Sequence, residues 1–333
     1  MDIFNTLQTL NACHGPSGDE FAVAKAISAL AAPYADEICS DAMGNLIVRK
    51  KGSGPKVMFA AHMDSIGVIV THIEEEGFVR FGSVGGLSLA GLLHTAVRFA
   101  NGVRGTVCAD AGADLKKLSV ADLYIDIGAH SREEAEKQVS LGDTAVFDAP
   151  AFAAGDCIIS PYLDNRISCV ILLAALEQLG DTDNDLYFVF TTQEEVGLRG
   201  AKTAAYGIDP DYGVAVDVTM SDDTPGAKHN GSSVFGKGAA IKVMDSSIIC
   251  HPRMVSKLTE LAKEKGIAWQ NDVIRGGGTD AGAIHVTRAG VYTGGISIPC
   301  RYIHSPGEMV QLSDVEACIA LSAAFACAKL EEV

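Results

Sequence analysis

The sequence has no basic run that would locally reverse its negative charge and no apolar stretch long enough to cross a bilayer. Its longest apolar run, "CVILLAAL", begins at Cys169 and is far shorter than a membrane span. With 26 basic and 42 acidic residues, the chain carries a formal net charge of -16, which repels phosphate backbones and anionic lipid. We therefore expect neither nucleic acid nor a membrane as a partner.

Paired cysteines and a basic leader are also missing. The nine cysteines are an odd number without any CxxC pair, which argues against a disulfide framework and against a thiolate zinc site. The first residues, "MDIFNTLQTL", have an aspartate where a signal peptide carries basic residues. These features predict a cytoplasmic protein.

Several common catalytic signatures are absent. Nothing in the chain matches GxSxG, HExxH or a Walker motif, which removes the usual serine hydrolase, zincin and nucleotide-binding readings. The glycines of "GGGTDAGAIH" (276–285) are not spaced as GxGxxG. A loop in which Thr279 or Asp280 caps a helix is the favoured interpretation there.

Short apolar runs separated by helical patterns dominate the rest of the chain. At 333 residues with 48% hydrophobic and 20% charged residues, the chain exceeds what one core usually serves, so two domains are expected. Strands are predicted at "NLIVRK", "KVMFAA", "DLYFVF", "YGVAVDV" and "VYTGGISI", and helices at "RISCVILLAALEQL", "HPRMVSKLTELAKEKG" and near the C-terminus. Apolar strands without alternation between helices indicate an α/β domain with a mostly parallel sheet and helices on both faces.

A helix is also predicted near the start of the chain. Ser17 and Glu20 have the spacing of a capping box, in which each side chain bonds to the other's backbone. Apolar residues then follow on one helical face at Phe21, Ala24, Ile27 and Ala31.

The segment 67–155 has a different pattern. "GFVRFGSVGG" and "TAVRFANGVRGTVCAD" alternate apolar with polar or small residues and contain many glycines, as half-buried antiparallel strands do. One helical stretch, "SREEAEKQV", interrupts it. We expect a small inserted β-rich domain at 67–155 and a discontinuous catalytic domain formed by 1–66 and 156–333.

Histidines and carboxylates follow the buried strands. His62 and Asp64 end one strand, Glu194 and Glu195 follow another, and Asp217 ends a third, while "SPYLDNR" adds Asp164 and "RYIHSPGE" adds His304. Because α/β sheets bind ligands at the carboxyl ends of their strands, these side chains are expected to gather in one site. Imidazoles and carboxylates without cysteine suit zinc, cobalt or manganese.

The neighbouring glutamates of "FVFTTQEEVGLRGA" need their own explanation. Adjacent side chains on a strand point to opposite faces, so the pair indicates either a solvated loop or two carboxylates with different tasks. Taken alone the pair favours the loop, because charged residues are mostly exposed. The histidines and aspartates that follow the other strands favour the second interpretation, in which the two carboxylates have different tasks.

Five segments together resemble a known family. "AAHMDSIG", "SPYLDNR", "TTQEEVGLRGA", "AVDV" and "RYIHSPGEMVQLSDVE" are similar, in the same order, to the signature segments of the tetrahedral aminopeptidases. These are also known as the glutamyl or deblocking aminopeptidase family of co-catalytic metallopeptidases. The similarity extends over nearly the whole chain, from "GPSGDE" through "DIGAHSREEA" to the last helix.

The resemblance implies two divalent metal ions in each subunit, with zinc expected first and cobalt or manganese as options. One ion would be held by His62, Asp164 and Asp217, and the other by Asp164, Glu195 and His304. Asp64 would orient His62, and the Asp164–Asn165 peptide would be cis. Glu194 would be the general base for a hydroxide shared by the two metals. The loops at 228–242 and 276–285 would border the substrate cleft.

The implied function is an aminopeptidase acting on short peptides, assembled from dimers into a tetrahedral dodecamer through the inserted domain. Alternatives are an N-acyl deacylase or carboxypeptidase with the same site, a glycoside hydrolase or a non-catalytic metal scaffold. A glycoside hydrolase fits poorly, since it needs spaced carboxylates and no histidine-rich metal cage. The preferred N-terminal residue stays open among glutamyl, leucyl and lysyl.

Overall fold

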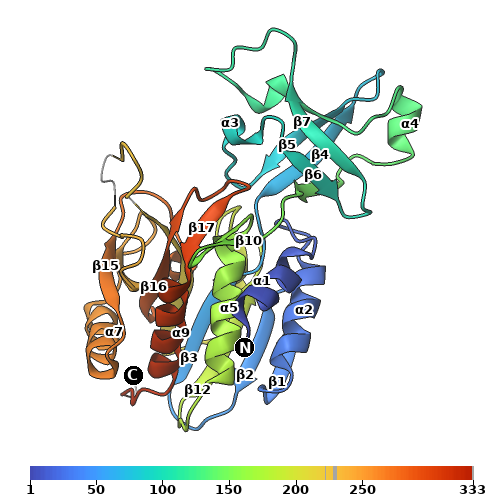
Figure 1. Cartoon of the computed structure of the whole chain (residues 1–333). Helices are drawn as coiled ribbons and strands as arrows, with labels where there is room; N and C mark the ends of the chain where they lie inside the picture. Colours follow the sequence, from blue (N-terminus) through green and yellow to red (C-terminus); the bar gives the residue numbers. More distant parts are fainter. Residues whose placement is uncertain (222, 228–230, 332–333) are drawn as a thin grey trace.

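The computed structural model describes residues 1–221, 223–227 and 231–331, which form a large sheet flanked by helices and a smaller closed barrel. Figure 1 shows the barrel projecting from one end of this layered body. The predicted α/β class with a separate β-rich unit is confirmed.

Four parallel strands form the centre of the large sheet, in the order β12 (Asp185–Thr191), β3 (Lys56–His62), β13 (Tyr212–Met220) and β16 (Tyr292–Arg301). Parallel pairing is concentrated in these strands. The flanking strands are β1 (Glu37–Ser40) and β2 (Leu46–Lys50) on one side, and β17 (Glu308–Gln311), β11 (Cys157–Ser160), β10 (Phe152–Ala154), β14 (Ala239–Met244) and β15 (Trp269–Val273) on the other.

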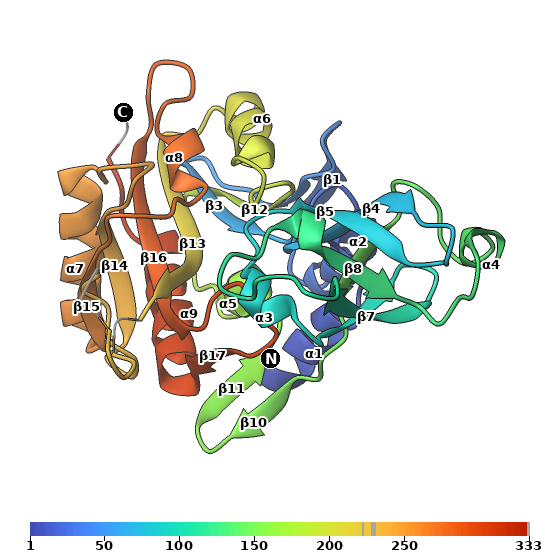
Figure 2. The same ribbon diagram turned by 90° about the horizontal axis from the view of Figure 1, so that it is seen from above.

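Both faces of the sheet are covered because both faces of its strands are apolar. In β3, Val57 and Phe59 belong to one core cluster, whereas Met58 and Ala60 belong to another on the opposite face. Figure 2 shows the two helical layers on either side of the strands. The larger layer contains α1 (Ile3–Asn11), α2 (Phe21–Ala31), α5 (Leu163–Glu177), α7 (Pro252–Lys265) and α9 (Leu312–Ala326), and the smaller one α6 (Arg199–Ile208) and α8 (Ala281–Ile284).

Helix α5 lies centrally in the larger layer, which explains its long apolar run. It contacts α1, α2 and α9 as well as the sheet, and residues 165–176 are all buried. Among the residues that the structure describes, no helix has both the length and the hydropathy needed to cross a membrane.

The barrel closes on itself and has its own core. Its strands follow the order β4 (Gly67–Ile73), β5 (Val79–Val84), β8 (Leu123–Asp126), β7 (Arg104–Ala109), β6 (Ala96–Phe99) and β9 (Thr144–Phe147). The short helices α3 (Leu89–Leu92), η1 (Val120–Asp122) and α4 (Arg132–Glu136) lie in its connections. Strand β10 follows the barrel and pairs with β11 in the large sheet, so barrel pairing ends at Phe147.

The start of α2 differs from the prediction. The helix begins at Phe21, but Glu20 makes no side-chain capping bond and Phe21 is 79% exposed. Ile27 and Ala31 of the predicted apolar face are buried, and Val23 joins them in place of Phe21. The capping-box prediction was wrong because Ser17 and Glu20 bond to residues distant in the sequence. Helix α1 was not predicted at all.

Candidate metal centre

The sheet opens where the predicted site residues lie. Strand β3 pairs with β13 only from Val57 to Ala60, whereas β13 stays paired with β16 as far as Met220. The last pair between β3 and β13 joins Ala60 to Ala215. His62 and Asp217 each lie two residues beyond this pair, on the two sides of the opening. Asp217 therefore lies within β13 and not at its end. Ligands of α/β proteins bind where neighbouring strands diverge in this way.

A cavity of about 810 Å³ extends from this opening. Six of the seven predicted site residues line it, and the seventh, Asp64, is fully buried behind it. The loop at 276–279 lines the same cavity, as do Gly231 and Lys242. Lys242 lies in β14, so the predicted loop at 228–242 was too long, because its last residues pair within the large sheet. Residues 228–230 of that loop lie outside the described part of the chain.

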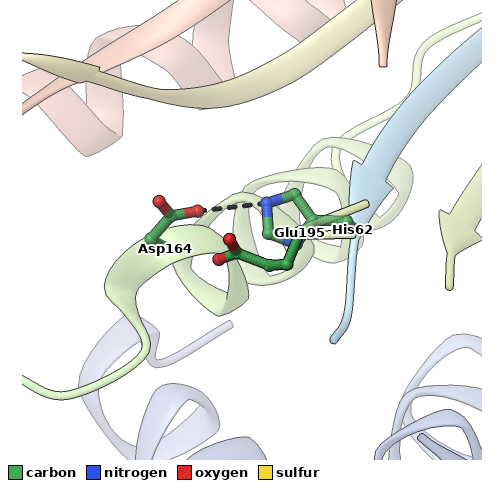
Figure 3. A group of neighbouring side chains, drawn as sticks. All are labelled: His62, Asp164 and Glu195. Carbon is green, nitrogen blue, oxygen red and sulfur yellow. Dashed lines mark ion pairs between the residues drawn. The ribbon is translucent and has the colours of Figure 1, made fainter. Parts of the chain in front are cut away.

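Asp164 lies between the two histidines. Its Oδ1 is 3.0 Å from His62 Nε2, and its Oδ2 is 3.3 Å from His304 Nε2. Figure 3 shows Asp164 at the start of α5 facing His62, with the Glu195 carboxylate beside them. The two oxygens of one carboxylate thus face two different imidazoles.

Each imidazole also has a second set of carboxylates. His62 Nε2 lies 3.8 Å from both Asp217 Oδ1 and Glu194 Oε2, and His304 Nε2 lies 3.3 Å from Glu195 Oε2. Within the described part of the chain, ligand atoms close enough to share an ion occur in two overlapping groups: His62, Asp164 and Glu195, and His62, Glu194 and Asp217. His304 is in neither group, but it lies beside Asp164 and Glu195. The structure therefore brings together all of the predicted metal-site residues.

The adjacent glutamates reach the cavity because the chain leaves extended geometry before them. Gln193 adopts a left-handed conformation with φ 54°, and the Glu194 and Glu195 amides donate to Asp64 Oδ1 and Oδ2 at 3.0 and 3.3 Å. Both side chains then line the cavity. The turn resolves the problem of opposite faces that a continued strand would have posed.

Asp64 also faces His62 on the side away from the cavity. His62 Nδ1 lies 3.2 Å from the Asp64 carbonyl and 3.5 Å from its Oδ1. A proton held on Nδ1 by these oxygens leaves Nε2 free as a ligand atom.

Comparison with known proteins decides the family. The M42 glutamyl aminopeptidase family matches residues 44–321. This chain belongs to the M42 family. The lysyl aminopeptidase of Pyrococcus furiosus is 38% identical over 87% of each chain. An aminopeptidase structure from Desulfurococcus kamchatkensis superposes with a TM-score of 0.94 at 41% identity, covering 98% of this chain and 94% of that one.

A third relative provides information on assembly. The structure of the Pyrococcus horikoshii TET1 peptidase, described as able to form a tetrahedron or a large octahedral shell, matches with a TM-score of 0.87. It is 33% identical and covers 98% of this chain and 99% of its own. The M42 chain is therefore an aminopeptidase, a peptide hydrolase of a metallopeptidase family.

The charges of the M42 site favour bound cations. Burial raises the pKa of Glu194 and Asp217 well above the usual range, and neighbouring carboxylates add to the effect. Although burial opposes protonation of His304, Asp164 and Glu195 raise its pKa to about 11. Burial also opposes protonation of His62, but the carboxylates that face it raise its pKa. Carboxylates and imidazoles so close together, away from water, are stabilised by protons or by metal ions.

The donors of the M42 site also fit divalent metals chemically. All are nitrogen or oxygen atoms, which suits zinc and its neighbours. Glu195 Oε1 is buried and has no hydrogen-bond partner, as expected for an oxygen that serves as a ligand. The Asp164–Asn165 peptide is cis.

Two buried carboxyl groups near the M42 site were not assigned to it by sequence analysis. Glu308 accepts the backbone amides of Asp164 and His304, both at 2.8 Å. Asp280 stands at the N-terminus of α8 without capping it, and accepts instead from Thr191 Oγ1 at 2.5 Å. Burial raises the pKa of Asp280 to about 6. Glu308 lies only four residues after His304, and this proximity was the one signal available.

Proposed function

We propose that the chain is a two-metal aminopeptidase that removes the N-terminal residue of short peptides. The observation that supports this most strongly is the position of Asp164, whose two oxygens face His62 and His304 separately. A carboxylate shared in this way is suited to bridging two ions.

We assign one ion to His62, Asp164 and Asp217, and the other to Asp164, Glu195 and His304. Zinc is the first choice, with cobalt and manganese as alternatives. When bound, such ions polarise the scissile carbonyl and lower the pKa of a nearby water.

Glu194 is the general base in this proposal. It lines the cavity, and its backbone is held by Asp64. Burial raises the pKa of its carboxyl group, which makes its carboxylate a better proton acceptor near neutral pH. Glu194 takes a proton from the attacking water and returns it to the departing amine.

The test is a set of peptides that differ only at the N-terminus. An aminopeptidase cleaves a tripeptide with a free α-amine and not its N-acetylated form, and a chelator abolishes cleavage until metal is returned. Removal of the acetyl group itself would establish the deacylase alternative. A set of aminoacyl chromogenic substrates, each assayed with zinc, cobalt and manganese, would identify the preferred residue and metal.

We also propose that the chain forms a tetrahedral dodecamer from dimers. The support is the assembly described for the P. horikoshii relative, together with exposed apolar side chains on the barrel, Leu115 and Leu141, at 63% and 67%. Sedimentation should give a dodecamer for the wild type and smaller species for Leu115→Asp/Leu141→Asp. A monomer at micromolar concentration would contradict this assembly.

Cytoplasmic location completes the proposal. All nine cysteines are free thiols, including the exposed Cys39, as expected in a reducing compartment. Cell fractionation with an antibody against the chain would test this assignment.

A further inference from the structure

The four consecutive backbone amides of residues 192–195, which include the pair of glutamates, all donate hydrogen bonds to side chains from elsewhere in the chain. Thr192 donates to Asn45 Oδ1 at 3.0 Å and Gln193 donates to Glu20 Oε1 at 3.1 Å. The next two amides, of Glu194 and Glu195, donate to Asp64. No regular helix or strand forms here, and the carbonyls of Thr192, Gln193 and Glu194 accept amides from residues 197–200. These side chains therefore supply the acceptors for the amides of the turn.

Two of the contributing side chains come from the segment Ser17–Glu20. Ser17 Oγ donates to Asp64 Oδ2 at 2.6 Å, the same oxygen that accepts the Glu195 amide. Glu20 is 6% exposed, and its Oε1 accepts from Gly18 as well as from Gln193. Neither contact stabilises helix α2 in the manner of a cap.

The segment itself is held firmly. Pro16 forms a parallel bridge with Ser65, the Ser17 amide donates to the Ser65 carbonyl, and the Ser65 amide donates to the Gly15 carbonyl. The fully buried guanidinium of Arg166 donates to the same Gly15 carbonyl. Ser17 is thereby fixed beside Asp64.

Gln193 is the reason that such support is needed. Its φ of 54° is a left-handed conformation, which a residue with a side chain adopts only when its surroundings enforce it. Glu20 holds the amide of this residue directly. The Gln193 and Glu194 carbonyls also accept main-chain amides, from Arg199 and from Gly197 and Leu198, but these bonds do not replace the acceptor of the Gln193 amide. Loss of Glu20 therefore loosens the turn and shifts Glu194 relative to the cavity.

We infer that Ser17 and Glu20 are positioning residues for the general base Glu194. Glu20 holds the left-handed turn at Gln193, and Ser17 orients the Asp64 carboxylate that accepts the next two amides. The catalytic part of this inference rests on the proposed function, whereas the positioning of the backbone does not.

The test compares Ser17→Ala and Glu20→Ala with the conservative Ser17→Thr and Glu20→Gln, which keep a hydroxyl donor and an oxygen acceptor. Val23→Ala serves as the control, because Val23 is buried in α2 and its truncation destabilises the segment without touching Asp64 or Gln193. Ser28→Ala, in α2, controls for the loss of a serine hydroxyl that contacts neither Asp64 nor Gln193.

The first measurement is hydrogen exchange of the metal-saturated protein, followed by mass spectrometry of peptides covering 190–197. We expect both alanine variants to exchange there about tenfold faster, since each loses a hydrogen bond that holds this turn. The conservative variants and both controls should match the wild type in this peptide. Equal acceleration in Val23→Ala, or none in the alanine variants, would overturn the inference.

The second measurement is steady-state kinetics with metal content. We expect kcat to fall by about tenfold to a hundredfold in the alanine variants, because misplacing a catalytic group by about 1 Å has effects of this size. KM and metal stoichiometry should stay close to wild type, with kcat largely restored in the conservative variants. Unchanged kcat in the alanine variants would refute the positioning of Glu194. If the wild type cleaves no peptide, the proposed function fails, and hydrogen exchange still decides the positioning role.

Discussion

The backbone amide of Glu194 donates to the carboxylate of Asp64 at 3.0 Å, although the two residues are 130 positions apart. Asp64 also lies next to His62 Nδ1. One buried carboxylate therefore fixes the backbone of the proposed base and faces a proposed metal ligand. The position of the base and the orientation of the ligand are coupled through this single group.

Glu194→Gln should separate catalysis from metal binding. The change keeps the shape of the side chain but removes the basic carboxylate, so kcat should fall by about a hundredfold or more. Metal content by elemental analysis should stay at the wild-type level. Loss of a metal with little loss of rate would show that the roles of the two glutamates are reversed.

Glu195→Gln should behave in the opposite way. Removing a charged ligand weakens the binding of one metal ion. Activity should therefore fall at limiting metal concentration and recover in part when metal is added in excess. Titration of turnover against metal concentration checks this. A rate that is low at every metal concentration while both ions stay bound would contradict the assignment.

Metal binding should release protons. In the metal-free protein the pKa of His304 is raised to about 11, so its imidazole holds a proton at pH 7 that a metal must displace. The pKa of His62 is also raised, which acts in the same direction. Metal affinity should therefore increase from pH 6 to pH 8, by about tenfold per pH unit for each proton displaced. Calorimetry in buffers of different ionisation enthalpy counts these protons. An affinity independent of pH would be the contrary result.

The same raised pKa has the opposite consequence for folding of the metal-free protein. Because folded His304 keeps its proton up to about pH 11 and an unfolded histidine loses it near pH 6.5, its contribution to stability is complete below about pH 6.5 and declines toward pH 11. The difference in unfolding free energy between wild type and His304→Gln should shrink as the pH is raised from 6.5 to 10. Urea titrations of both metal-free proteins measure it. A difference that grows with pH would contradict this sign.

Glu308→Ala should weaken both the fold and the metal site. Glu308 is 2% exposed and accepts the amides of Asp164 and His304, and a buried donor without a partner costs about 1–3 kcal/mol. We expect a loss of about 2 kcal/mol or more in urea unfolding together with lower metal affinity. Glu308→Gln keeps one acceptor oxygen and should lose less of both. Reduced stability with unchanged metal affinity would restrict Glu308 to a role in folding.

Lys242→Met should destabilise the wall of the cavity. Lys242 Nζ lies 2.6 Å from Asp272 and 4.0 Å from Asp245, and all three residues are buried. Removing the cation leaves buried carboxylates unpaired, which costs about 3–5 kcal/mol. Adding Asp272→Asn to Lys242→Met should restore part of the unfolding free energy. An additive double variant would indicate that the two groups do not interact.

Sequence patterns were sufficient for those parts of the protein in which neighbouring residues share one environment. The buried strands at 56–62 and 212–220 and the helix at 163–177 follow from runs of apolar residues, because each run must be removed from water as a unit. The polar residues that follow or interrupt these strands predicted the metal-site group, since parallel strands bring their carboxyl ends together.

Tertiary structure alone decided how that group is held. Ser17 and Glu20 have the spacing of a helix cap, yet they bond to Asp64 and to the amide of Gln193, and only their distances in the folded chain favour these partners over the local ones. The contacts of Glu308 with Asp164 and of Asp280 with Thr191 likewise join residues that no periodic pattern relates. A hydrogen bond depends on distance and direction in space, whereas a sequence pattern records only what lies a few residues away. The sequence therefore determined which side chains approach the site, and the fold determined which backbone amides and carboxyl groups hold them there.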